Sequence, residues 1–240
     1  MIGIVVVSHS PDLANAAVAL ALQMTGDKRP PIAIAAGAGD GVIGTDAVRV
    51  AAAIDEVASP GGVLVFMDLG SAVLSTTMAL EFRESTTPVR LSSAPFVEGI
   101  VAGVVLAAAG ASLDEADSEA SSAMTAKNAQ LGQNDAPAEP APAAALSTTV
   151  EAVAEATIVN EVGLHARPAS LIVAKLGEFD AKVTISDADD PKRQASAASL
   201  LGLMGLGLAK GTRLRFTGRG ADAAAAVEAL RAMTADGYGE

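Results

Sequence analysis

The chain has 240 residues, of which 50% are hydrophobic and 18% are charged, as is typical of a globular protein. It contains no cysteine, which excludes a disulfide framework and a thiolate metal site and is typical of a reducing cytoplasm. Of the net charge of −12, most falls in residues 1–150, which carry 6 Lys+Arg against 16 Asp+Glu; residues 151–240 carry 10 against 12. This acidic balance disfavours nucleic acid as a partner, because no basic stripe is available to displace counterions.

The sequence carries no recognisable targeting segment. The N-terminus lacks a basic leader, and its apolar run over residues 2–7 is too short for a signal peptide. The longest apolar stretch, residues 100–109, is shorter than the roughly 20 residues that a membrane-spanning helix needs. We therefore expect a soluble, cytoplasmic protein with no membrane partner.

Strand and helix patterns alternate through residues 1–110. The predicted strands are short apolar runs rich in β-branched residues, at residues 2–7, 32–36, 61–68 and 87–93. Four helices are predicted between and after these strands. The first begins at Pro11, where Ser10 is a typical N-cap, and the second covers residues 47–58; the third ends at Arg83 and the fourth follows Pro95. This βαβα order predicts an α/β fold with a doubly wound parallel sheet. A peripheral helix is predicted over residues 112–131.

An Ala/Pro-rich segment divides the chain. Between Gln133 and Thr149 it reads "QNDAPAEPAPAAALSTT", and each of its prolines disfavours helix at the preceding residue. Such a composition predicts a semi-rigid spacer without core-forming residues. The expected organisation is one domain over residues 1–132, a linker over 133–152 and a second domain over 153–240.

The second domain has a different order of elements. Strands are predicted at residues 156–162, 182–189 and 213–218, and helices at 168–176 and 221–233. On the last helix, Ala223, Val227, Leu230 and Met233 are spaced to form an apolar face. A small α/β sandwich follows, with all its helices on one side of one sheet.

His9 is one of only two histidines in the chain, and it directly follows the first predicted strand. Ligands of open parallel sheets bind at the carboxyl ends of strands. Asp68 ends the third predicted strand, and it would lie beside His9 if these two strands are neighbours. A carboxylate on one ring nitrogen would leave the other as a nucleophile, and nearby helix N-termini would favour a phosphate. An ordinary polar loop histidine is the competing interpretation, and the residues alone leave the two nearly balanced.

His165 is the second histidine and lies in the stretch "GLHARPA", at a strand-to-helix junction. Pro168 suits a first helical turn, whose amide groups and dipole would face a phosphoryl group on the ring. Arg167 would supply a guanidinium group that matches phosphate oxygens. Histidine, arginine and helix end together predict a phosphate site without a metal or a cofactor.

The stretches "GLHARPA" and "SAASLLGLMGLGLAKGT" resemble HPr, the histidine phosphocarrier of the bacterial phosphotransferase system, and the resemblance covers residues 157–240. It implies an open-faced α/β sandwich in which His165 is phosphorylated through Nδ1 and Arg167 stabilises the phosphate. Ser199 falls where some members carry a regulatory phosphoserine. Because its neighbours Ala198 and Gly205 depart from those members, a helix N-cap is the favoured interpretation of Ser199.

The N-terminal domain resembles the enzyme IIA domains of the mannose type. The matching stretches are "VVVSHSPDLA", "IAIAAGAGDGVIGTDAV" and "VLVFMDLGSAVLS". The segment "MDLGSA" and the domain order are similar to the phosphocarrier subunits of the phosphoenolpyruvate-dependent dihydroxyacetone kinase. The resemblance implies that His9 is phosphorylated, with Asp68 as its hydrogen-bonding partner.

Together the resemblances imply a phosphotransferase subunit that relays phosphate from enzyme I through His165 and His9. The acceptor would be ADP on the nucleotide-binding subunit of dihydroxyacetone kinase. Because the chain stops before an enzyme I-like domain that some relatives add, separate enzyme I is the expected donor. Free HPr as an intermediate and a homodimer formed by the N-terminal domain are further implied partners.

Three alternatives remain at this point. A IIA–HPr fusion that feeds a sugar permease would use the same chemistry, and "MDLGSA" argues against it. A regulatory phosphoprotein would be favoured by phosphorylation of Ser199. A dinucleotide-binding enzyme is suggested by the glycines of "AAGAGDGVIG", but the G-x-G-x-x-G spacing is not met and the stretch follows the second strand.

Overall fold

The computed structural model describes residues 1–39, 41–131 and 152–239. These residues separate into two compact units, Met1–Ala123 and Met124–Glu240, which are described one at a time. The predicted joint between Gln133 and Thr149 lies outside the described residues, so the division into residues 1–132, 133–152 and 153–240 stays a prediction. No described helix is both long enough and apolar enough to cross a membrane.

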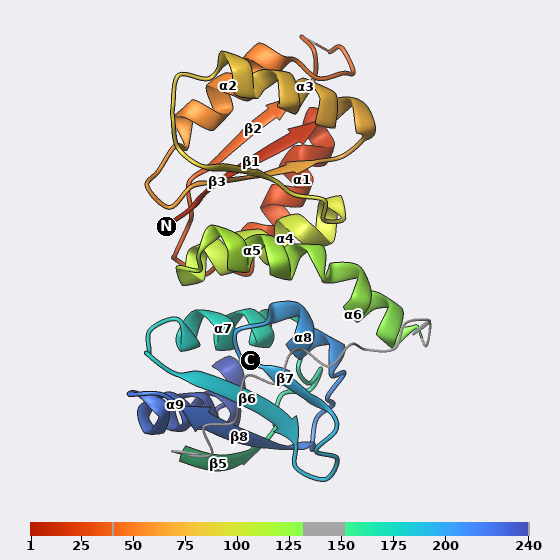
Figure 1. Cartoon of the computed structure of the whole chain (residues 1–240). Helices are drawn as coiled ribbons and strands as arrows, with labels where there is room; N and C mark the ends of the chain where they lie inside the picture. Colours follow the sequence, from red (N-terminus) through yellow and green to blue (C-terminus); the bar gives the residue numbers. More distant parts are fainter. Residues whose placement is uncertain (40, 132–151, 240) are drawn as a thin grey trace. The chain divides into compact units, whose positions relative to one another are not determined.

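The N-terminal unit contains a four-stranded parallel sheet in the order β2-β1-β3-β4. Its strands are β1 (Gly3–Ser8), β2 (Ile32–Ala36), β3 (Val63–Met67) and β4 (Val89–Leu91). The helices are α1 (Pro11–Leu22), α2 (Ala47–Glu56), α3 (Gly70–Phe82), α4 (Phe96–Ala109) and α5 (Leu113–Ser121). α2 and α3 cover one face of the sheet, whereas α1, α4 and α5 cover the other (Figure 1). The predicted doubly wound sheet is confirmed.

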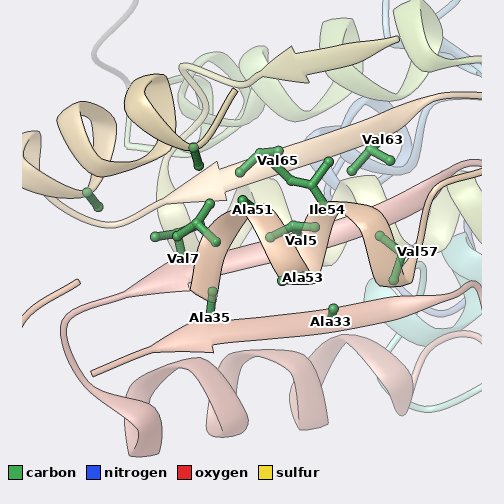
Figure 2. Close-up of a cluster of buried hydrophobic side chains, with 13 residues drawn as sticks. Val5, Val7, Ala33, Ala35, Ala51, Ala53, Ile54, Val57, Val63 and Val65 are labelled. Atoms are coloured by element: carbon green, nitrogen blue, oxygen red, sulfur yellow. The ribbon is translucent and has the colours of Figure 1, made fainter. Parts of the chain in front are cut away.

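Alternate residues of the central strands pack into two separate hydrophobic cores, one on each face of the sheet. Val5, Val7, Val63 and Val65 point toward α2 and pack with Ile54, as Figure 2 shows. On the opposite face, Phe66 is fully buried against α4. A Cβ atom at Gly103 of α4 would lie 2.5 Å from the Phe66 ring, so the glycine is what lets the helix approach. Burial on both faces explains why β1 and β3 read as continuous apolar runs.

The C-terminal unit contains an antiparallel sheet in the order β5-β8-β6-β7. Its elements are β5 (Ala152–Thr157), α7 (Ala166–Leu176), β6 (Lys182–Asp187), β7 (Gln194–Ser196), α8 (Leu200–Gly205), β8 (Arg213–Arg219), α9 (Ala223–Ala235) and a 3₁₀ turn (Gly237–Gly239). α9 packs on β5, β6 and β8, and α7 contacts α8 and α9. Burial alternates along β8, where Leu214 and Phe216 are buried between exposed arginines. One covered face and one open face match the predicted open-faced sandwich.

Besides small shifts at helix ends, three sequence predictions differ from the structure. The strand predicted at residues 156–162 is β5, which ends at Thr157, because Asn160 and Gly163 form a hydrogen-bonded turn that ends the extended chain. The single helix predicted over 112–131 is divided at Ser122 into α5 and α6 (Ala123–Gln130). β7 was not predicted, since its three residues have no apolar alternation of their own.

Replacement of Phe66 tests the packing of α4 on the sheet. We expect Phe66→Ala to lower the free energy of unfolding of the N-terminal unit by about 3–5 kcal/mol, because a buried ring is lost and a cavity remains. Phe82→Ala is the control, since Phe82 is 52% exposed, and it should cost only about 0.5 kcal/mol. Urea denaturation of the full chain, followed through amide resonances of β3 with those of β8 as internal reference, measures both. Equal losses for the two variants would contradict the packing described.

Candidate functional sites at two histidines

His9 is held between the end of β1 and the start of α1. Ser10 is the N-cap of α1, and its hydroxyl oxygen accepts a hydrogen bond from the Leu13 amide at 3.3 Å. Pro11 is the first helical residue, which fixes the backbone where the chain leaves the strand. The local sequence therefore stops the strand, starts the helix and leaves His9, partly exposed, at the edge of the sheet.

Asp68 reaches His9 because β1 and β3 are neighbouring parallel strands, with Val7 opposite Met67. Its Oδ1 accepts from His9 Nδ1 at 2.9 Å and from the Leu69 amide at 2.7 Å. Its Oδ2 accepts from the His9 amide at 2.8 Å and from the Ser8 hydroxyl at 2.9 Å. One carboxylate thus gathers four donors at the point where strand order reverses between β1 and β3.

The protonation of Asp68 determines which nitrogen of His9 is available. Burial opposes ionisation of Asp68, but the hydrogen bonds from the His9 amide and ring, Ser8 and Leu69 together hold its pKa below the usual value. An ionised carboxylate can only accept, so the proton of a neutral His9 ring lies on Nδ1 and the lone pair on Nε2. Nε2 lies 2.6 Å from the hydroxyl oxygen of Ser71, in the first turn of α3. In a neutral His9 ring, the lone pair therefore lies on Nε2, on the side of the ring that faces α3.

A glycine-rich loop forms hydrogen bonds with the backbone at His9. Gly37 donates its amide to the Ser8 carbonyl at 3.1 Å, and Gly44 donates to the His9 carbonyl at 3.2 Å. Gly44 has a φ of 153°, and a Cβ atom there would lie only 2.8 Å from that of Ala38. These glycines, which suggested a dinucleotide site, thus hold the strand end in place.

His165 lies at the start of α7, as its N-cap residue, with an extended backbone. It follows the turn closed by Asn160, whose side-chain amide donates to the Gly163 carbonyl at 2.7 Å. Leu164 then donates its amide to the Leu208 carbonyl at 2.8 Å, which fixes the chain beside the end of α8. The helix begins at Ala166, two residues earlier than predicted, and Pro168 lies in its first turn as expected.

The surroundings of His165 favour an anion. The first amide groups of α7 have no carbonyl group within the helix to which they could donate a hydrogen bond. They also lie at the positive end of the helix dipole. No side chain within the described residues caps α7, and the same holds for α3 beside His9. Arg167 is exposed in the same first turn, and Ser170 donates its hydroxyl to the Arg167 carbonyl at 2.8 Å. A phosphoryl group on His165 would have both amides and a guanidinium within the same turn.

Ser199 has the local role that its sequence favours. It is the N-cap of α8, and its hydroxyl oxygen accepts from the Gly202 amide at 2.9 Å. A Cβ atom at Gly202 would lie 2.6 Å from that oxygen, so the glycine makes room for the cap. The N-cap interpretation is confirmed, and phosphorylation of Ser199 stays a prediction.

Sequence reasoning missed two side chains of the His9 site. Ser8 could have been noticed as the only polar residue of β1, but its bond to Asp68 spans 60 positions. Ser71 lies 62 positions from His9, and nothing local marks it as a partner of the ring. The described residues contain no group of three or more His, Asp or Glu side chains that could hold a metal ion.

Comparisons with known proteins divide the chain in the same way. Residues 3–117 match the family described as the PTS system fructose IIA component, and residues 152–236 match that of the PTS HPr component phosphorylation site. The multiphosphoryl transfer protein of Escherichia coli O157:H7 is 41% identical over 87 residues, which are 36% of this chain and 23% of that protein. The N-terminal unit is thus similar to a IIA component, and the C-terminal unit to an HPr component, of the phosphotransferase system.

Two relatives match this chain over all of its residues. The phosphoryl donor subunit DhaM of PEP-dependent dihydroxyacetone kinase is 38% identical to this chain in Klebsiella michiganensis, over 245 residues, and in Escherichia coli K12, over 250 residues. Each match covers 100% of this chain and 51% of the relative, so the chain spans about half the length of these relatives. Over its whole length, the chain is similar to phosphoryl donor subunits of the DhaM type.

Replacement of Asp68 by asparagine tests the assignment of Nε2. An amide has one accepting atom, and we expect its NH₂ group to face the His9 ring, which can accept once its proton moves to Nε2, so that the His9 amide and the Ser8 hydroxyl keep the oxygen. We expect Asp68→Asn to destroy the single Nδ1–H tautomer and to lower the free energy of unfolding by about 1–3 kcal/mol. Imidazole ¹⁵N–¹H correlation spectra measure the tautomer. Asp12→Asn, an exposed change in the first turn of α1, should leave it unaltered; an unaltered tautomer in Asp68→Asn would refute the assignment.

Proposed function

We propose that this chain is a phosphohistidine relay that carries phosphoryl groups from enzyme I, through His165 and then His9, to ADP bound on the nucleotide subunit of dihydroxyacetone kinase. The observation that carries the proposal is the orientation of the His9 ring: ionised Asp68 binds Nδ1 at 2.9 Å, so the lone pair of the neutral ring lies on Nε2. A second histidine at the start of α7 supplies the other station of the relay.

The transfer to His9 needs no change of protonation on its ring. The P–N bond of the donor breaks as a bond forms between phosphorus and Nε2, while the proton on Nδ1 stays in place. The phosphorylated ring then carries a positive charge, which the Asp68 carboxylate neutralises. On transfer to ADP, the Nε2–P bond breaks, a terminal phosphate oxygen of ADP takes the phosphoryl group, and the ring returns to its neutral form. The protein supplies position and charge stabilisation.

The partners follow from this sequence of transfers. Enzyme I, phosphorylated by phosphoenolpyruvate, is the proposed donor to His165, where Arg167 and the amides of α7 receive the phosphoryl group. Free HPr is a second proposed donor to His9. The acceptor is suggested by the relatives, whose names describe a phosphoryl donor subunit of dihydroxyacetone kinase. The relay would operate in the cytoplasm as a homodimer formed by the N-terminal domain. As a phosphotransferase, it would return to its unphosphorylated form after each phosphoryl group is transferred.

Phosphosite mapping tests both stations. After incubation with phosphoenolpyruvate, enzyme I and HPr, we expect phosphate on His9 and His165 of the wild type. His9→Ala should keep label on His165 but deliver none to ADP on the kinase nucleotide subunit. Label on any other residue would overturn the site assignment. Delivery to a sugar permease component, with none to ADP, would instead identify a sugar transport fusion.

Transfer within one chain has its own test. Because both histidines belong to one polypeptide, the effective concentration of one at the other is on the order of mM if their faces meet. We expect an equimolar mixture of His9→Ala and His165→Ala chains, at micromolar concentration and without free HPr, to deliver phosphate more slowly than the wild type. An equal rate would show that transfer between molecules is sufficient.

A further inference from the structure

Ser71 contacts the reactive nitrogen of His9 directly. Its hydroxyl oxygen lies 2.6 Å from Nε2, and Ser71 is the second residue of α3, two positions after the N-cap Leu69. Since Nδ1 carries the ring proton, the Ser71 hydroxyl is the donor in this bond and Nε2 is the acceptor. Both nitrogens of the neutral ring are therefore engaged in the structure, and the lone pair that would attack phosphorus is occupied.

Attack on phosphorus requires the Ser71 hydroxyl to leave Nε2. The Ser71 side chain is exposed, so rotation about its Cα–Cβ bond meets little packing resistance. A phosphoryl group on Nε2 would place its oxygens where the hydroxyl now lies, at the uncapped start of α3. The same hydroxyl can then donate to a phosphoryl oxygen, which is a charged and stronger acceptor than a neutral ring nitrogen.

We propose that Ser71 is a switching hydroxyl that masks Nε2 in free His9 and holds the phosphoryl group in phospho-His9. The proposal rests on phosphorylation of His9, as proposed above, and adds a residue that sets how strongly His9 retains its phosphate. The proton of Ser71 stays on its oxygen in both states and only its acceptor changes. The bonds made and broken to phosphorus are those of the relay itself.

The two hydrogen bonds of Ser71 predict the direction of the effect. Removal of the hydroxyl takes a neutral bond from free His9 and a charge-assisted bond from phospho-His9. Because the charge-assisted bond is roughly twice as strong, the phosphorylated state loses more. In Ser71→Ala, the equilibrium ratio of phospho-His9 to phospho-His165 should therefore fall about fivefold, whereas Ser71→Thr should restore most of it.

Two measurements on the full chain test the proposal. In the free protein, the ¹⁵N resonance of His9 Nε2 should move in Ser71→Ala, because its hydrogen-bond donor is gone. In the protein equilibrated with phospho-HPr, ³¹P spectra give the ratio of the two phosphohistidines. Thr77→Ala is the matched control: it removes an exposed hydroxyl from α3 that donates to the Val73 carbonyl, away from His9, and should change neither result.

The outcomes separate this proposal from the relay. An unmoved Nε2 resonance in Ser71→Ala, or an unchanged or raised ratio of phosphohistidines, overturns the role of Ser71 while the relay stands. If wild-type His9 takes no phosphate at all, the relay fails and the holding role of Ser71 fails with it. Backbone amide spectra of α3 show whether Ser71→Ala keeps its fold. If the fold is lost, two other measurements, the Ser71→Thr variant and the Nε2 resonance of the wild type across pH, show whether the Ser71 hydroxyl donates a hydrogen bond to Nε2.

Discussion

The hydrogen bonds of Asp68 are the interaction on which the His9 site depends. One carboxylate accepts from the backbone and ring of His9, from Ser8 and from Leu69, so it joins the end of β1 to the start of α3. Burial alone would raise the pKa of Asp68, and the four donors reverse that effect. Because the carboxylate stays ionised, it fixes the ring tautomer and supplies a negative charge to a phosphorylated ring. A neutral or bulkier residue at this position would lose both properties.

The two histidine centres use the same physical device on different folds. Each histidine lies where a helix begins without a side-chain cap, at α3 for His9 and at α7 for His165. A capped helix start, such as that of α1 with Ser10, has already satisfied some of its amides. An uncapped start keeps amide donors and a positive dipole end for a phosphate. The centres differ in the charged group nearby, which is a carboxylate bonded to the ring at His9 and, in the proposed relay, the exposed guanidinium of Arg167 at His165.

That difference suits a direction of transfer. Asp68 binds the ring of His9 and would stabilise positive charge on it, whereas the His165 ring is half-exposed and Arg167 is exposed in the first turn of α7. At the His9 centre, Ser71 adds a hydroxyl group that contacts the ring. In the proposed relay, His165 receives and passes on readily, and the retention of phosphate at His9 is tuned by Asp68 and Ser71.

Local chemistry was sufficient for the elements and for the two histidines. The start of α1 was predicted because Ser10, Pro11 and Asp12 each suit their position near a helix N-terminus. The stretch around His165 was equally informative, since its histidine, arginine and proline all act within one turn. The predicted bounds of β5 and the single helix predicted across Ser122 were wrong, because an apolar run and a helical composition do not show where a turn interrupts them.

Sequence by itself determined the doubly wound sheet, the open-faced sandwich and the candidacy of His9 and His165, because strand periodicity and helix caps are encoded by near neighbours. Only the tertiary structure decided that the ring proton of a neutral His9 lies on Nδ1 and the lone pair on Nε2. That assignment needs β1 beside β3, which brings Asp68 to Nδ1 across 59 positions, and α3 packed so that Ser71 meets Nε2 across 62. Contacts over such separations depend on strand order and helix placement, and no local pattern records them.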